Sequence, residues 1–77
     1  MESYKNLSGN SGVTAYAVVD EGILVRFQDG GIYLYTYESA GRSNIERMRA
    51  LAAEGRGLST YISRQVHDDY AAKFVRD

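Results

Sequence analysis

The stretch that decides the fold is FQDGGIYLYTY, residues 27–37, in which two glycines precede tyrosines at three alternate positions. Residues at alternate positions of a β-strand lie on the same face of a sheet. The glycines supply a turn back to ILVRFQ, residues 23–28, and a DEG turn separates that run from VTAYAVV, residues 13–19. These β-branched and aromatic runs predict a three-stranded antiparallel β-meander.

The length of the second turn decides which face the tyrosines take. A two-residue turn at residues 29–30 would put Tyr33 and Tyr35 on the face opposite Val25. A three-residue turn at residues 28–30 would put the two tyrosines on the same face as Val25. Both turns suit the glycines. Because apolar stripes are more often core than ligand-binding features, we favour the three-residue turn, with the tyrosines in the core.

The favoured turn leaves an aliphatic second face on the sheet. Its residues would be Leu24, Arg26, Ile32 and Leu34. An exposed aliphatic patch with a central arginine is a candidate binding site. The two-residue turn would instead expose the tyrosines beside Arg26, as a platform on which RNA bases stack. In either case we expect a second copy, another protein or unstacked bases to cover this face.

After residue 37 the apolar period changes from 2 to about 3.6, which is typical of helices. Ser43 and Glu46 form a capping-box pattern, and Gly55 can end that helix. Its predicted buried stripe is Ile45, Met48, Leu51 and Ala52. A second helix is predicted from Ser59, with apolar residues at Ile62, Val66, Tyr70 and Phe74.

The fold predicted from these patterns is α+β, a three-stranded antiparallel β-meander with two helices packed on one face. Residues 1–12 are polar and rich in Ser, Asn and Gly, so we expect a flexible N-terminal lead-in. Residues 13–77 then form a single domain.

Composition excludes several classes of protein. The 77 residues include no cysteine, which rules out disulfides and thiol chemistry. The longest apolar run, Ala15 to Val19, is far shorter than the roughly 20 residues of a membrane helix, so we expect a cytoplasmic protein with no membrane partner. The net charge of -1 requires a local basic patch for any binding to nucleic acid.

Catalytic and metal-binding constellations are not expected. His67, the single histidine, stands beside Asp68 and Asp69, but three adjacent residues of a helix do not share a face. Ser59 is explained as a helix cap rather than as a nucleophile. We therefore expect no enzymatic activity, no metal and no small-molecule cofactor.

Two motifs carry a resemblance to a known family. Phe27, Gly30, Tyr33 and Tyr35 fill the pattern F-x-x-G-x-x-Y-x-Y, and the stretch from Gly55 to Ile62 fits Gly-(Lys/Arg)-x-aromatic-(Asn/Ser)-x-x-Ile with Leu58 at the aromatic place. The chain resembles the KTSC domain, which is named after its occurrence at the carboxyl end of some lysyl-tRNA synthetases and also occurs as free-standing bacterial and phage proteins. RNA binding has been proposed for that family. The chain lacks the Val-Pro that usually follows the tyrosines in the family.

These observations predict a non-catalytic binding module that contacts RNA or a nucleoprotein complex. Arginine is in excess between residues 42 and 64, and Arg42 and Arg56 flank the first helix in predicted loops. The candidate contact residues are Arg26, Tyr33, Leu34, Tyr35, Arg42 and Arg56. The alternative is a small protein-protein interaction module, such as a phage- or mobile-element-encoded inhibitor of a host machine, that acts through the uncovered sheet face. Homodimerisation through that face is a third possibility.

Overall fold

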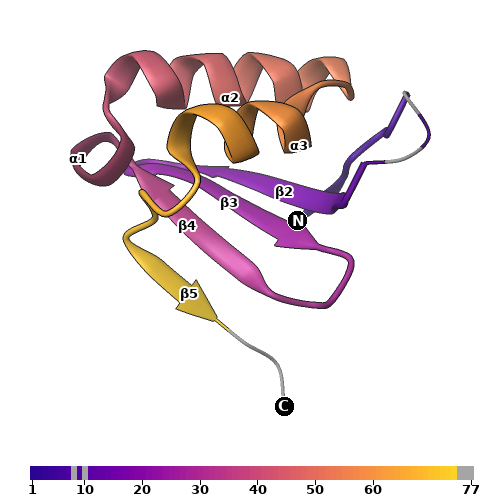
Figure 1. Cartoon of the computed structure of the whole chain (residues 1–77), viewed down its shortest axis with the longest axis horizontal. Helices are drawn as coiled ribbons and strands as arrows, with labels where there is room; N and C mark the ends of the chain where they lie inside the picture. The colour runs from indigo at the N-terminus through magenta and orange to yellow at the C-terminus, as the bar shows by residue number, and fades with distance from the viewer. Residues whose placement is uncertain (8, 10, 75–77) are drawn as a thin grey trace.

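The chain folds into a sheet covered on one face by helices (Figure 1). The computed structural model describes residues 1–7, 9 and 11–74. The antiparallel sheet has the order β1-β2-β3-β4-β5, with β1 Glu2–Ser3, β2 Val13–Val19, β3 Gly22–Phe27, β4 Ile32–Thr36 and β5 Ala72–Phe74. The helical layer consists of α1 Tyr37–Ala40, α2 Arg42–Glu54, α3 Leu58–Tyr61 and the π-helical turn η1 Ile62–Val66. The predicted α+β class, an antiparallel sheet with helices, is confirmed.

The turn between β3 and β4 has three residues, 28–30, so the favoured register is confirmed. Val25 lies opposite Tyr33, and Ile23 lies opposite Tyr35. Gly30 has a φ of 90°, a left-handed conformation that glycine adopts at little cost. The Asp29 carboxylate accepts the Gly31 N–H at 2.8 Å, which satisfies a donor in the turn.

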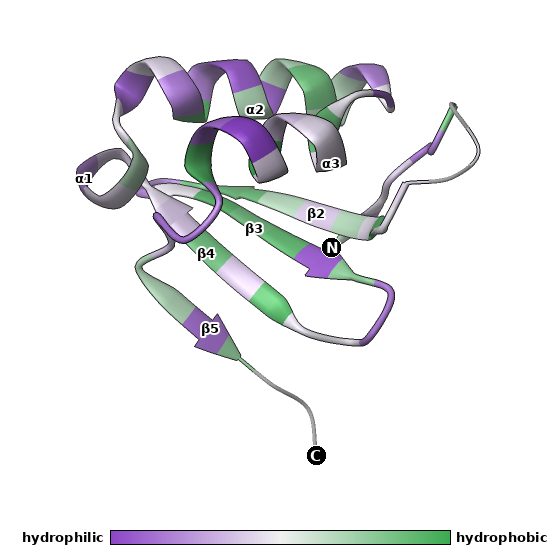
Figure 2. Cartoon of the chain, viewed as in Figure 1, coloured by the Kyte–Doolittle hydropathy of each residue, from purple (hydrophilic) through white to green (hydrophobic). Residues whose placement is uncertain are grey.

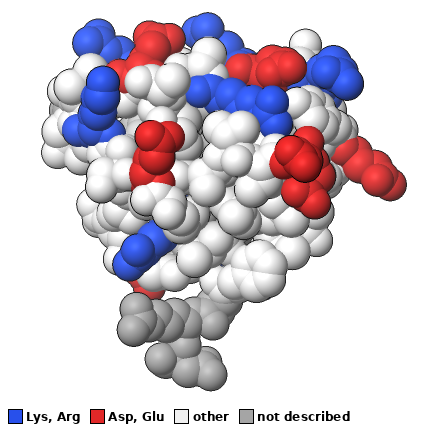
Figure 3. Space-filling view, turned by 180° about the vertical axis from the view of Figure 1, so that it is seen from behind, with Lys and Arg blue, Asp and Glu red and all other residues white. Residues whose placement is uncertain are grey.

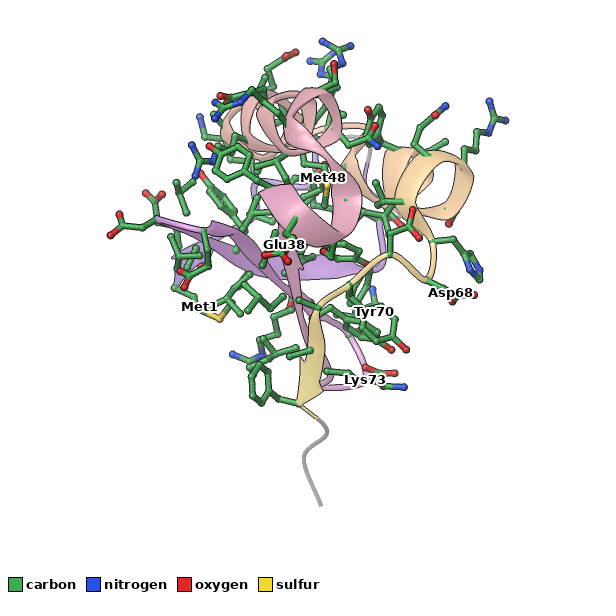
Figure 4. All side chains as sticks on the ribbon, turned by 90° about the vertical axis from the view of Figure 1, so that its left-hand side faces the viewer. Met1, Glu38, Met48, Asp68, Tyr70 and Lys73 are labelled. Carbon is green, nitrogen blue, oxygen red and sulfur yellow. The ribbon has the colours of Figure 1, made fainter. Side chains whose placement is uncertain are left out.

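The core lies between the helical layer and the tyrosine-bearing face of the sheet. Tyr35 is 1% exposed, and Ile23, Ile45 and Leu58 are fully buried with it. Met48 points from α2 toward the sheet (Figure 4). Hydrophobic residues follow β3 and β4 and the sheet-facing side of α2 (Figure 2). The predicted stripe of the first helix is buried as expected, and Gly55 ends α2 in the left-handed conformation.

The sheet has five strands, so the prediction of three is wrong. The extra edge strand β1 comes from the segment expected to be a flexible lead-in, and it pairs with β2. Tyr4 is 5% exposed, and its hydroxyl accepts the Leu58 N–H at 3.2 Å. The fold therefore begins before residue 13. Residues 75–77 of the predicted domain lie outside the described residues.

The prediction of one long second helix is wrong beyond Val66. The helix begins at Leu58 after Gly57, so Ser59 lies within its first turn and is not the predicted cap. The chain leaves the helix at His67 and returns as β5, where the Ala71 N–H donates to the Leu34 carbonyl at 2.7 Å. Pairing with β5 satisfies the backbone N–H and C=O groups on the outer edge of β4. Those groups would have had no partner in the sheet if the helix had continued.

The capping box occurs one element earlier than predicted. Thr36 Oγ1 accepts the Ser39 N–H at 2.9 Å, and Ser39 Oγ accepts the Thr36 N–H at 3.0 Å, which begins α1. α2 then begins at Arg42 without a side-chain cap, so Ser43 lies within its first turn. A Ser or Thr followed three positions later by a side chain that can bond back forms a capping box only when the first residue precedes the helix. Ser43 already lies in the helix, so Ser43 and Glu46 do not form one.

Replacement of Gly22 by alanine tests the close approach of β3 to β4. A Cβ on Gly22 would meet the Tyr35 carbonyl oxygen and lie 2.8 Å from Thr36 Cα, both backbone atoms that cannot move aside. We expect Gly22→Ala to lower the free energy of unfolding by about 3 kcal/mol in urea titrations. Gly12→Ala is the control, because its Cβ would meet no atom closer than 3.8 Å. Equal effects of the two substitutions would contradict this account.

Candidate functional site

The six predicted contact residues do not form one site. Tyr33 and Tyr35 lie on the covered face of the sheet, whereas the register places Arg26 and Leu34 on the uncovered face. Arg42 opens α2 and Arg56 follows its end. Helical rise separates those two arginines by roughly 20 Å, so one phosphate cannot contact both.

The tyrosines form an aromatic cluster rather than a stacking platform. Tyr33 makes edge-to-face contacts with Phe27 and Tyr70 at ring-centre distances of 5.2 and 5.0 Å. The Lys73 ammonium lies 5.2 Å from the centre of the Tyr33 ring. Tyr70 and Lys73 lie on the same side of β5 (Figure 4). Because other rings and Lys73 already contact Tyr33, this cluster holds β5 in place.

Tyr35 is the most buried member of the cluster. Its hydroxyl donates to the His67 carbonyl at 3.4 Å. Burial raises the pKa of Tyr35 far above its ordinary value, and the neighbouring Tyr33 raises it further. A neutral, buried phenol is suited to packing and cannot stack on a nucleic-acid base.

Two arginines on α2 are engaged in contacts within the fold. Arg42 and Arg49 each lie 3.9 Å from Glu46 and flank the Tyr37 ring, at 4.7 and 5.2 Å from its centre. Arg49 also donates to the carbonyls of Val19 and Gly22 at 2.8 and 3.2 Å. These bonds tie α2 to the turn between β2 and β3, which makes Arg49 structural.

Three other arginines border one groove between α2 and α3. The groove consists of two adjoining hollows of about 500 and 460 Å³, and both are lined by Arg47, Leu51 and Thr60. Arg56 lines the first hollow and Arg64 the second. In the part of the chain that the structure describes, none of these three arginines has an ion-pair partner. We call this surface the arginine groove.

The folding of the helices assembles the arginine groove. Gly55 and Gly57 both have left-handed φ angles, and they let α3 turn back beside α2. The turn brings Arg64 close to Arg47, 17 positions earlier in the sequence. The groove carries a single carboxylate, Glu54, and hydroxyl groups that donate to anions. The excess of arginine was visible in the sequence, but the spacing alone did not reveal that Arg47 and Arg64 share a surface.

The uncovered face of the sheet is apolar. Strand register places these residues on it: Ser3, Ala15, Ala17, Val19, Leu24, Arg26, Ile32, Leu34, Thr36, Ala72 and Phe74. Arg26 is the one charged residue among them. Met1 also lies on this side of the sheet (Figure 4), and uncharged atoms occupy the middle of the molecule viewed from behind (Figure 3). We call this surface the open face.

A hollow of about 600 Å³ lies where β4 passes into α1, next to the turn between β2 and β3. Its lining residues are Glu21, Thr36, Tyr37, Glu38, Ser39 and Ala71. The side chain of Glu38 lies just below α1 (Figure 4). Two exposed carboxylates therefore stand at the opposite end of β3 from Arg26. We call this the acidic hollow.

No metal centre or membrane span is evident in the described residues. They contain no group of three or more His, Asp or Glu side chains placed to hold an ion. His67 Nδ1 lies 2.9 Å from the Asp68 carboxylate, and both side chains are exposed. Within the same described residues, no helix combines the length and apolar character needed to cross a membrane.

No protein-family model, curated protein or solved structure matches the chain. The resemblance to the KTSC domain therefore stays a prediction from the two motifs.

The raised pKa of Tyr35 predicts a loss of stability at high pH. A phenol with a folded-state pKa above the ordinary value of about 10 stabilises the fold fully below that pH, and the contribution is lost as the pH rises above it. We expect the free energy of unfolding of the wild type to fall more steeply above pH 10 than that of Tyr35→Phe. Urea titrations at several pH values measure both slopes. Equal slopes for the wild type and Tyr35→Phe would show that the fold does not raise the pKa of Tyr35.

Proposed function

We propose that the chain is a non-catalytic module that binds the phosphodiester backbone of RNA in the arginine groove. The observation that carries the proposal is that Arg47, Arg56 and Arg64 border one groove without an ion-pair partner among the described residues. Arginines that are not paired within the fold keep their donors available to an anion.

The chemistry of the groove suits a chain of phosphates. A guanidinium group binds phosphate oxygens through two parallel hydrogen bonds. Arg56 and Arg64 line different hollows and Arg47 lines both, so the positive charges extend along the groove and can follow successive phosphates. Tyr61 lines the second hollow, but it is partly buried and its hydroxyl donates to the Asn44 side-chain oxygen at 2.6 Å. We therefore expect phosphate contacts to dominate and binding to show little sequence preference.

The net charge of -1 is compatible with this proposal because the acidic residues are concentrated elsewhere. Glu21 and Glu38 line the acidic hollow, and Asp29 and Asp68 border the aromatic cluster. The motif resemblance offers separate support, since Arg56 occupies the Lys or Arg position of the KTSC pattern.

Salt dependence tests binding in the arginine groove. For single-stranded RNA, each phosphate contact contributes about 0.7 to the slope of log affinity against log salt. We expect a slope of about -2 for the wild type by fluorescence anisotropy, and a reduction of about 0.7 for each of Arg47→Gln, Arg56→Gln and Arg64→Gln.

Arg42→Gln is the matched control for these variants. Arg42 lies on the same helix but contacts Glu46 and Tyr37, so its replacement should leave the slope unchanged. Absent or salt-insensitive binding of the wild type would contradict the proposal.

Protein-protein interaction through the open face is a second candidate function. Antiparallel sheets commonly carry polar residues on a solvent-facing side, whereas here Leu24, Ile32 and Leu34 lie on it. Aliphatic residues on a second face are expected when another layer of protein covers them.

Leu34→Asp tests this second function. Leu34 is partly exposed and lies outside the buried core, so the variant should keep its fold by circular dichroism while binding of a protein partner falls at least about tenfold. Ala53→Asp, on the exposed side of α2, is the control for an added charge. Unfolding of Leu34→Asp would show that Leu34 belongs to the core.

A further inference from the structure

We propose that a second copy of this chain occupies the open face, in a two-fold symmetric dimer that pairs Arg26 of each copy with Glu21 of the other. The inference goes beyond RNA binding. It names an occupant for the open face, on which the second candidate function depends, and it uses no feature of the arginine groove.

The two ends of β3 carry complementary charges, because Arg26 lies on the open face and the exposed Glu21 lies in the adjoining turn. Arg26 stands near one end of the strand, and the turn with Glu21 stands at the other end. The two positions are about 17 Å apart at the rise of a β-strand. A two-fold axis in the interface, perpendicular to the strands and midway between the levels of Ile23 and Leu24, reverses the strand direction. It therefore brings Arg26 of one copy over Glu21 of the other.

The same rotation also matches shape. Phe74 is 54% exposed and pairs with Ile32, which places it at the level of Arg26 along the sheet. Thr36 and Ala71, at the other end of β4 and β5, line the acidic hollow. Reversing the strands places the Phe74 ring of each copy at the acidic hollow of the other.

Charge distinguishes this arrangement from alternatives on the same face. A two-fold axis parallel to the strands would place Arg26 of one copy at the same level as Arg26 of the other. That arrangement brings two positive charges together. Glu21 and Glu38 are exposed, and neither has an ion-pair partner among the described residues. A second copy supplies a cation at this end of the sheet and requires no further protein.

The size of the face indicates a weak dimer. Five strands at about 4.8 Å spacing and six residues along β3 give a patch of about 20 by 20 Å. Its planar area of about 400 Å² is below the roughly 800 Å² that each partner buries in a standard interface. We expect dissociation in the micromolar range. The helices face outward in this dimer, so the arginine groove of each copy stays accessible.

Sedimentation equilibrium between about 10 and 500 μM tests the dimer at concentrations that bracket micromolar dissociation. The wild type should approach twice the chain mass of 8.6 kDa as concentration rises. Arg26→Glu and Glu21→Arg should each weaken association about tenfold by placing like charges together, and the double variant should restore it. Phe74→Ala should also weaken association. Arg47→Glu, which reverses a charge on the helical side, should leave it unchanged.

Two results would overturn the inference. A wild type that stays monomeric throughout the range excludes the dimer, whether or not a different protein then binds the open face. A double variant that fails to restore association, while circular dichroism shows an intact fold, excludes the proposed register. RNA binding measured on the same samples reports separately on the arginine groove, so failure of one proposal does not imply failure of the other.

Discussion

The three-residue turn between β3 and β4 is the constraint on which the rest of the structure depends. Side chains alternate between the two faces of a strand, so one residue more or less in this turn would exchange every residue of β4 between core and solvent. Gly30 in its left-handed conformation and the bond from the Gly31 N–H to Asp29 hold the turn at three residues. Tyr35 consequently enters the core, and Leu34 is left on the open face.

The same register explains why a chain of 77 residues builds a core large enough to fold. A small domain buries a smaller fraction of its surface than a large one, and a large ring such as Tyr35 contributes more than an aliphatic side chain would. The aromatic cluster then extends the core outward through Tyr33 and Tyr70 to the edge strand β5. The cost of this arrangement is an apolar open face, because the residues between the tyrosines are also aliphatic.

The helical layer separates structural arginines from available ones. Arg49 binds carbonyls of the turn between β2 and β3, and Arg42 shares Glu46 and Tyr37 with it. Arg47 and Arg64 lack such partners among the described residues, and both line the second hollow of the arginine groove. Identical side chains thus have different roles according to the face of the helix that carries them. The open face and the arginine groove lie on opposite layers, so both can be occupied at once.

Local patterns in the sequence determined the three central strands and the first helix with its buried stripe and its end at Gly55. These features depend on residues close together in the chain, where periodicity and glycine conformation act directly. The register of the tyrosines was favoured by the sequence but not determined by it, because both turn lengths suit the glycines. Only the tertiary structure decided the contributions of distant segments. Tyr4 enters the core beside the distant Leu58, whose N–H donates to the Tyr4 hydroxyl. Residues 72–74 form a strand instead of continuing the predicted helix, because they pair with the edge of β4. The arginine groove likewise exists only once the glycine turn folds α3 beside α2, since the positions that form it are not periodic in the sequence.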